Sequence, residues 1–302
     1  MKHRNPILSA FLAMVLAGCV VIQATGNASK TPVKRPAFVG IAHIALKVSD
    51  LSAARDFYTR VLGFQEAFTI GSGELTAVCF KVNDHQYIEV SPTLKDKTGD
   101  RLSHIAYETT DAQRLRDYLA SRGIAVVDKL RRGSDRNLSF MVQDPDGHNV
   151  EFVQYLPGSL HSRNFGKFLA DTRISDHIVH VGVTVKDHDL AEHFYKDILD
   201  FGSIGSRGAG GDHVAVPMPE GSGRLEYMFN LRKDLIAIMN HVALSVPNME
   251  EATRVLLERG MKYNEEFNDR RQASRFLNLL DPDGTRIELD AVPRPSSPAL
   301  PR

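Results

Sequence analysis

Hydrophobic and other residues alternate between positions 41 and 48, which predicts a β-strand. Ile44, Leu46 and Val48 fall on one face of this strand, and His43 falls on the opposite face beside small or polar residues. The apolar face must pack beneath a helix, because burial of that face is what stabilises the strand. A sheet face floored with small side chains forms a cup instead of a core, so we expect His43 to line a cup.

A helix and three more strands are predicted directly after this first strand. Apolar residues recur with helical spacing over 51–62, where Asp50 is placed to cap the helix and Gly63 to end it. Three short strand-like runs follow, near residues 64–70, 75–81 and 86–91. The pattern therefore predicts a module with the element order βαβββ.

The same module recurs along the chain at a constant distance. Phe57-Tyr58 is matched by Phe194-Tyr195, and the turn Asp-Pro-Asp-Gly that begins at Asp144 is matched by one that begins 137 residues later. Strands led by a His also restart inside each half, so that modules begin near residues 39, 100, 176 and 237. A fixed offset of this kind indicates a tandem duplication.

The repeat predicts an α+β fold of four βαβββ modules in tandem, paired into two domains with cupped mixed sheets. The modules can pair within each half, or the first can pair with the fourth and the second with the third. The expected divisions are a leader over 1–28, a first domain over 38–157, a linker over 158–173, a second domain over 174–292 and a flexible Pro- and Ser-rich tail over 293–302.

Each module carries one His near its start and one Glu in its last strand, 46 or 47 residues apart. A buried carboxylate or imidazole is costly unless it is paired or bound to a cation. A structural His–Glu hydrogen bond would explain any one pair, but four pairs in matched register favour sites for divalent metal ions. The predicted metal ligands are His43, Glu89, His104, Glu151, His180, Glu226, His241 and Glu288.

Composition narrows the classes of partner. The 302 residues include 37 Lys and Arg against 37 Asp and Glu, and this zero net charge creates no general field that would attract nucleic acid. The two cysteines, Cys19 and Cys79, are separated by the leader boundary, which rules out a disulfide framework. We expect a small-molecule substrate, no nucleic-acid partner, and a monomer or homodimer.

The leader predicts export. Lys2 and Arg4 precede an apolar run over 7–22 that is too short and too rich in Ala and Gly for a good membrane span. Within it, the segment that ends at Cys19 (Leu-Ala-Gly-Cys) resembles the lipobox of bacterial lipoproteins, which implies lipid attachment at that cysteine. The alternative is an ordinary signal peptide. We expect a periplasmic protein or a bacterial lipoprotein that meets the membrane only through Cys19.

Four features together resemble the vicinal oxygen chelate superfamily: the His-led strand, the Phe-Tyr pair on the helix, the Asp-Pro-Asp-Gly turn and the terminal Glu. This superfamily includes glyoxalase I, methylmalonyl-CoA epimerase, extradiol dioxygenases and bleomycin- or fosfomycin-resistance proteins. The resemblance covers nearly all of residues 38–292 and is specific for the fold. It implies that the eight residues above are metal ligands, and that every possible pairing of modules yields two full sites.

The ligand set resembles that of glyoxalase I, which implies a metal-dependent lyase or isomerase. The implied reaction is proton transfer next to a carbonyl whose oxygen is polarised by Ni, Zn, Co, Mn or Fe(II). Glu151 and Glu288 are the candidate general bases. Because glutathione chemistry belongs to the cytosol and this chain carries an export leader, we expect a different, small substrate.

Two alternatives stay open. An extradiol dioxygenase that cleaves catechol-type rings on Fe(II) would use two His and one Glu, and this family usually carries a Tyr three residues before the last Asp-Pro. Met141 and Asn278 stand at those positions, and the fourth ligand is present, both of which weaken this alternative. The other is a non-catalytic binding or resistance protein, a class that commonly lacks the metal ligands.

Overall fold

Two sheets with the same strand order form the framework of the protein. The computed structural model describes residues 33–73, 76–208, 211–231, 239–261 and 276–291. The predicted leader with Cys19, and the predicted tail over 293–302, lie outside the described residues. The described residues cluster as one compact unit. In the described part of the chain, no helix is long and apolar enough to cross a membrane.

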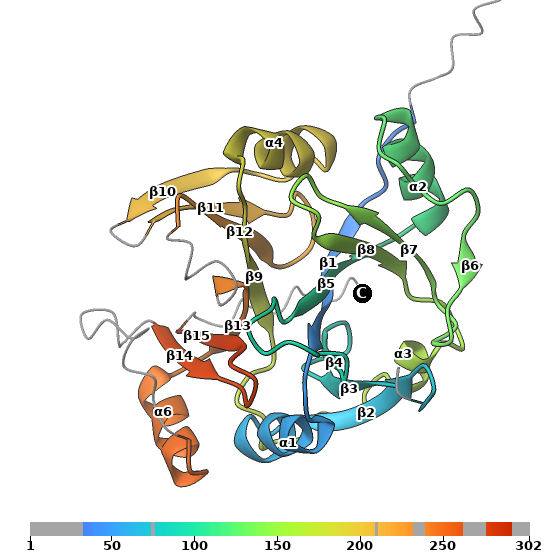
Figure 1. The fold of residues 1–302 in the computed structure, drawn as a ribbon. Helices are drawn as coiled ribbons and strands as arrows, with labels where there is room; N and C mark the ends of the chain where they lie inside the picture. Colours follow the sequence, from blue (N-terminus) through green and yellow to red (C-terminus); the bar gives the residue numbers. More distant parts are fainter. Residues whose placement is uncertain (1–32, 74–75, 209–210, 232–238, 262–275, 292–302) are drawn as a thin grey trace, which may run out of the picture. The chain divides into compact units, whose positions relative to one another are not determined.

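The first half forms an eight-stranded sheet with the spatial order β2-β3-β4-β1-β5-β8-β7-β6. Figure 1 shows this sheet curling round strongly, with its long helices outside the curve. The two modules join where β1 and β5 pair in antiparallel orientation. The strands are β1 (Phe38–Lys47), β2 (Gln65–Ile70), β3 (Ala77–Lys81), β4 (Tyr87–Ser91), β5 (Leu102–Thr109), β6 (Arg131–Arg132), β7 (Leu138–Gln143) and β8 (Asn149–Gln154).

The second half repeats this order as β10-β11-β12-β9-β13-β15-β14 among its described strands. Its modules join through the antiparallel pair β9 and β13. Modules therefore pair within each half, which decides between the two pairings that the sequence left open. The strands are β9 (Ile178–Thr184), β10 (Ile204–Gly208), β11 (Gly211–Pro217), β12 (Arg224–Phe229), β13 (His241–Val246), β14 (Phe276–Leu280) and β15 (Arg286–Ala291).

The predicted first helix is present, but it changes type midway. Asp50 caps it as expected, since its carboxylate accepts from the backbone N–H groups of Ser52 and Ala53, and Gly63 follows its end with φ at +75°. The helix is α-helical only over α1 (Leu51–Asp56) and continues as a π-helical turn, η1. The helical segments are α1, η1 (Phe57–Val61), α2 (Ala112–Ser121), α3 (Leu160–Arg163), α4 (His188–Glu192), η3 (His193–Ile198) and α6 (Met249–Glu258).

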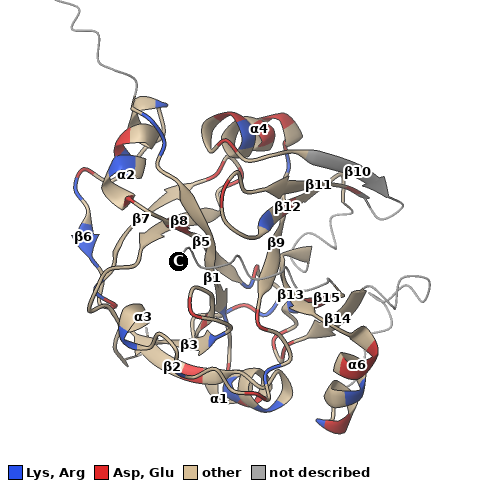
Figure 2. Ribbon diagram, turned by 180° about the vertical axis from the view of Figure 1, so that it is seen from behind, with Lys and Arg blue, Asp and Glu red and all other residues tan. Residues whose placement is uncertain are grey.

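The apolar strand faces build the core that the alternation predicted. Ile44 and Leu46 are almost fully buried in one cluster that also contains the helix residues Phe57 and Tyr58. A separate, small cluster of Ala42, Ala106 and Val153 together with Tyr155 lies apart from this core. Charged residues of both signs are interspersed along the surface helices α2, α4 and α6 (Figure 2).

Reciprocal hydrogen bonds join the two halves. The hydroxyl of Tyr58 in the first half donates to Asp281 Oδ2 of the second at 3.2 Å, and the hydroxyl of Tyr195 donates back to Asp144 Oδ2 at 2.9 Å. Both tyrosines are fully buried. The repeated Phe-Tyr and Asp-Pro-Asp-Gly motifs therefore recognise each other across the halves, which explains why they recur at the same offset.

Candidate metal centres

Strand register gathers the four predicted ligands of each half around two small residues. Ala45 of β1 lies opposite both Glu89 of β4 and His104 of β5. Ala106 of β5 lies opposite both His43 of β1 and Glu151 of β8. The small residues therefore form the floor that lets two imidazoles and two carboxylates point to one place, which is the cup expected from the sequence.

The second half uses the same register, with Gly182 and Ala243 as the floor. A Cβ at Gly182 would overlap the imidazole of His241, so only glycine leaves room for that ring. His241 is 2 % exposed and His180 is 1 % exposed. All eight predicted ligands thus lie in two clusters, four in each half.

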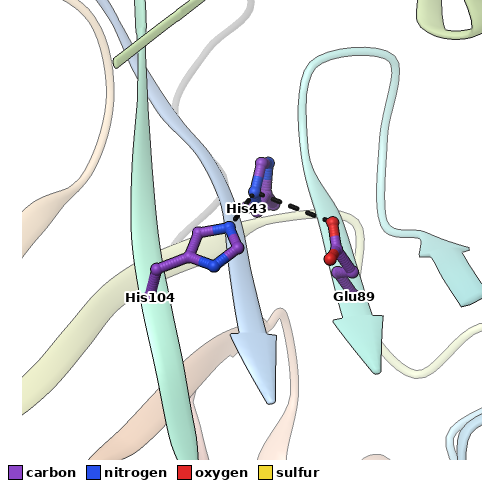
Figure 3. A group of neighbouring side chains, drawn as sticks. All are labelled: His43, Glu89 and His104. Carbon is purple, nitrogen blue, oxygen red and sulfur yellow. Dashed lines mark hydrogen bonds and ion pairs between the residues drawn. The ribbon is translucent and has the colours of Figure 1, made fainter. Parts of the chain in front are cut away.

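The first-half cup holds a tight group of donor atoms. The Nε2 atoms of His43 and His104 are 2.9 Å apart, and Glu151 Oε2 lies 3.2 Å from the first and 3.1 Å from the second. Glu89 Oε2 lies farther out, 3.9 Å from His43 Nε2. Figure 3 shows His43 between Glu89 and His104, each on its own strand and all pointing inward.

Electrostatics in this cup favour charged side chains. Burial acts to lower the pKa of His43, but the hydrogen bond and charge of Glu151 and the charge of Glu89 outweigh it and raise that pKa. Burial acts to raise the pKa of Glu151, but its bonds to His104 and His43 hold that pKa well below its usual value. The carboxylate of Glu151 is therefore a ready ligand and a weak base.

The linker supplies an aromatic wall beside the first-half cup, which the sequence did not indicate. His161 of α3 stacks on Tyr155 with ring centroids 4.2 Å apart, and Tyr155 packs against the small cluster that contains Ala106 of the floor. Asn137 Nδ2 donates to His161 Nδ1 at 2.7 Å, and burial lowers the pKa of His161 to about 3. The only possible signal was an unrepeated His in the linker, which has no partner at the offset of 137.

The second-half cup has similar spacing between its ligands. The Nε2 atoms of His180 and His241 are 3.0 Å apart, with Glu226 Oε2 at 3.3 Å and Glu288 Oε1 at 3.7 Å from His180 Nε2. His241 Nδ1 lies 2.7 Å from the backbone oxygen of Met239, to which it can donate.

Two arginines and an aspartate also enter the second-half cup. Arg224 Nη2 lies 2.9 Å from His180 Nδ1, and Asp290 Oδ2 lies 3.5 Å from each of those two nitrogens. Arg286 donates to Glu288 through Nη2 and to Asn278 Oδ1 through Nε. The sequence patterns did not predict a role for these residues, although the equivalent first-half positions, 137 residues earlier, carry no charged side chain.

In the second-half cup, the pKa values of the two histidines shift downward, opposite to that of His43 in the first-half cup. Burial, assisted by the charges of Arg224 and Arg286, lowers the pKa of His180 to about 3. Burial first, and then the charge of Arg286, hold the pKa of His241 well below its usual value. Burial and the charge of Glu288 raise the pKa of Glu226. Neutral imidazoles are thus favoured here, whereas the first-half cup favours charge.

The sequence matches a family model twice, described as the Glyoxalase/Bleomycin resistance protein/Dioxygenase superfamily, over residues 40–152 and 177–289. The chain belongs to this superfamily. Both matched segments fall inside the two predicted domains, and their starts and ends differ by the same 137 residues.

Curated relatives include members with two different activities. The chain is 29 % identical over 178 residues to a biphenyl-2,3-diol 1,2-dioxygenase of Paraburkholderia xenovorans, covering 53 % of this chain and 54 % of that protein. It is 28 % identical over 134 residues to a lactoylglutathione lyase of Neisseria meningitidis, covering 39 % of this chain and 92 % of that protein. The chain thus spans about half the length of the dioxygenase that it matches.

Solved structures share the fold. The 2,3-dioxygenase LapB from Pseudomonas sp. KL28 superposes with a TM-score of 0.63 and 14 % identity, over 87 % of this chain and 96 % of that one. A Mn(II)-bound glyoxalase from Novosphingobium aromaticivorans superposes with a TM-score of 0.58 and 17 % identity, over 84 % and 82 % of the two chains. The identities are low, so these likenesses establish the fold alone.

Proposed function

We propose that the protein is a divalent-metal-dependent lyase or isomerase that transfers a proton next to a carbonyl, and that the first-half cup is its active site. The observation that carries this proposal is the convergence of His43, His104 and Glu151 within 3.2 Å of one another. A metal ion bound about 2 Å from each ligand atom places those atoms roughly 3 Å apart. The donor set therefore fits such an ion.

The charge of the cup supports the same conclusion. Among the residues that the structure describes, no Lys or Arg lies within ion-pair distance of Glu89 or Glu151. Their side chains are only 16 % exposed. Two carboxylates with so little water need a cation, and a divalent ion supplies the matching charge. When bound, this ion would act as a Lewis acid on a substrate oxygen.

The fourth ligand has the geometry of a proton carrier. Glu89 is the most loosely placed of the four, since its carboxylate is 3.9 Å from His43 Nε2 while Glu151 is bonded to both imidazoles. A carboxylate that approaches and leaves the ligand group can take a proton from a substrate carbon and return it to a neighbouring atom. The sequence favoured Glu151 for this role in the first half, whereas the distances favour Glu89 as base and Glu151 as ligand.

The surroundings of the cup suit a small organic substrate. Tyr155 and the buried ring of His161 form an apolar wall at its side. Burial lowers the pKa of His161 to about 3, and the charges of His43 and Glu151 also act on that pKa. The predicted export leader favours a substrate outside the cytoplasm, and so not a glutathione conjugate. The similarity to a lactoylglutathione lyase over most of that protein's length supports this class of reaction.

The proposal is tested by metal reconstitution and deuterium exchange. The purified protein is stripped, reloaded separately with Ni, Zn, Co, Mn or Fe(II), and incubated in deuterated buffer with a panel of small α-hydroxycarbonyl compounds. We expect exchange of the proton next to the carbonyl, measured by NMR, to depend on the metal and to consume no oxygen. Metal-loaded protein that exchanges no proton on any of these compounds would contradict the proposal.

A dioxygenase remains the second candidate, because His43, His104 and Glu151 also make up a set of two His and one carboxylate. Glu89 as an additional ligand and Met141 opposite Glu151 on β7 weigh against it. Oxygen uptake with catechols by the Fe(II)-loaded protein would favour this candidate over the lyase.

A further inference from the structure

Ligand spacing alone would allow a metal ion in either half. Ligand atoms of His43, Glu89 and His104 all lie within 4.8 Å of one another, and the same holds for His180, His241 and Glu288. Any difference between the halves must therefore come from the side chains around the ligands.

Arg224 places a hydrogen-bond donor where a metal-binding histidine needs an acceptor. A His that binds metal through Nε2 carries its proton on Nδ1 and donates it to a carboxylate, a carbonyl or water. The guanidinium of Arg224 can only donate, so at 2.9 Å it requires His180 Nδ1 to accept. The neutral ring then carries its proton on Nε2, the atom that a metal would need.

Asp290 fixes this arrangement. Its carboxylate lies 3.5 Å from both Arg224 Nη2 and His180 Nδ1, and its side chain is 4 % exposed. Arg224 is thus anchored by a buried anion instead of being a surface side chain that happens to lie across the cup.

Arg286 pairs with a different ligand of the second-half cup, Glu288. It donates to Glu288, so that this carboxylate already has a cationic partner. His241 donates to a backbone carbonyl and would suit a metal by itself. Within the described part of the chain, His241 and Glu226 are then the two ligands without an arginine partner, and two ligands are fewer than the three or four of a typical divalent-metal site.

The charge balance of the two cups differs accordingly. The first-half cup has two carboxylates and, among its described neighbours, no arginine or lysine partner. The second-half cup has three carboxylates, and two of them have an arginine partner: Asp290 pairs with Arg224, and Glu288 pairs with Arg286. A divalent ion would neutralise the two carboxylates of the first-half cup. In the second-half cup it would be repelled by the guanidinium groups.

The three charged residues beside the second-half ligands have uncharged counterparts in the first half at the offset of 137. Tyr87, Asn149 and Val153 in the first half correspond to Arg224, Arg286 and Asp290 in the second. All three substitutions introduce charge, and all three surround the ligands.

We propose that the protein holds its metal ion in the first half only, and that Arg224 and Arg286 occupy the electrostatic place of a metal in the second-half cup. The ion pairs of Arg224, Asp290, Arg286 and Glu288 make that cup a structural counterpart of the metal centre. This inference rests on the proposed function only in giving the first half a metal.

The first test is the metal content of the whole protein, measured by mass spectrometry after reconstitution and exhaustive dialysis. We expect about one ion per chain. His43→Ala with His104→Ala should remove it, whereas His180→Ala with His241→Ala should leave it in place. Circular dichroism and thermal melting verify that each variant is folded. Two ions in the wild type, or loss of metal from the second-half variant alone, would overturn the inference.

The second test exchanges the surrounding residues and does not depend on removing ligands. Arg224→Tyr, Arg286→Asn and Asp290→Val together should raise the metal content of the chain by about one ion. Tyr87→Arg in the first half should weaken binding there by roughly 10- to 100-fold. No gain of metal in a folded triple variant would overturn the inference, because the arginines would then not be what excludes the metal.

These measurements also separate the inference from the proposed function. A wild type that binds no metal, together with a triple variant that gains one, contradicts the proposed function and a first-half metal, and supports only the exclusion of metal from the second half by its arginines. A wild type with one ion in the first half that shows no proton exchange supports the inference and contradicts only the proposed reaction.

Discussion

The cups of the two halves have the same strand register and the same four ligand types, yet their electrostatics are opposite. In the first half, His43 and Glu151 stabilise each other as an ion pair, and each shifts the pKa of the other toward its charged form. In the second half, burial, assisted by the charges of Arg224 and Arg286, lowers the pKa of His180 to about 3 and favours its neutral form. Arg224 donates to His180 Nδ1 and Arg286 donates to Glu288. The ligands of a repeated fold are thus insufficient to specify a metal site, because hydrogen-bond partners at nearby strand positions decide whether those ligands are available.

The two halves also differ in how tightly the cup is packed. The floor of the first has Ala45 where the second has Gly182, and His241 is pressed against the backbone at that glycine. The side chain of His104 is 13 % exposed and so remains accessible to a ligand, whereas His241 is 2 % exposed. Closer packing in the second half is consistent with a structural role.

The largest expected effect distinguishes Glu89 from its counterpart Glu226. Loss of a general base typically lowers kcat by about 10²- to 10⁴-fold, and we expect that loss for Glu89→Gln with metal still bound. Glu226→Gln, the matched control, should change kcat by no more than about 2-fold, because the second-half cup takes no part in the reaction. Steady-state kinetics with metal analysis measure both, and equal losses in the two variants would contradict an active site confined to the first half.

The next largest effect concerns the floor of the cups. Gly182→Ala should lower the free energy of unfolding by about 3 kcal/mol, the upper end for overpacking, because its Cβ would overlap the His241 ring and β9 is held between two strands. Ala45→Gly in the first half should cost only about 1 kcal/mol through backbone entropy. Urea unfolding of both variants gives the comparison. If the alanine is tolerated at 182 as well as at 45, the tighter packing of the second-half cup is wrong.

Much of this architecture was predictable from the sequence, because it depends on local patterns. The alternation around His43 predicted the strand faces, the cap at Asp50 was correct, and the constant offset predicted two halves with one strand order, as observed. The eight ligands come together because each is fixed by its place in a repeated strand.

Other features depend on partners that are distant in sequence. The modules of the first half pair through their first strands, β1 and β5. Every module begins with an equivalent strand, so no local pattern could show which two modules pair. The π-helical turn at Phe57 leaves the apolar spacing of a helix unchanged. Arg224 and Arg286 are typical of solvated strand ends, and only a comparison of equivalent positions in the two halves would have placed them beside His180 and Glu288.

A smaller effect tests the two reciprocal bonds between the halves. Tyr58→Phe should lower the free energy of unfolding by about 2 kcal/mol, because it deprives the buried Asp281 Oδ2 of its hydroxyl donor. Tyr195→Phe should cost less, about 1 kcal/mol, since Asp144 Oδ2 keeps its bond to His148 at 2.8 Å. Denaturant unfolding at neutral pH should therefore rank the two variants in that order, and the reverse order would mean that His148 does not compensate.

The smallest effect is a pH dependence that only one of these turns should show. Burial acts to lower the pKa of His148, but its hydrogen bond to Asp144 and the charge of that carboxylate outweigh burial and raise the pKa. The pKa of Asp144 is lowered by the same pair in spite of its burial. A raised pKa in the folded state stabilises the protein below the unfolded value near 6.5, and this contribution is lost as the pH rises through the raised pKa. The lowered pKa of Asp144 gives stability that is present above its unfolded value near 3.9 and is lost as the pH falls. The pair should therefore contribute most between about pH 4 and 6.5.

The second half has Thr285 at the position of His148, so His148→Thr makes the two turns alike. We expect this variant to be less stable than the wild type by about 1 kcal/mol at pH 5.5, with the difference shrinking toward pH 9. Thermal melts of both proteins across this range measure it, and a difference that is constant with pH would show that His148 stabilises the turn by packing and not by its charge.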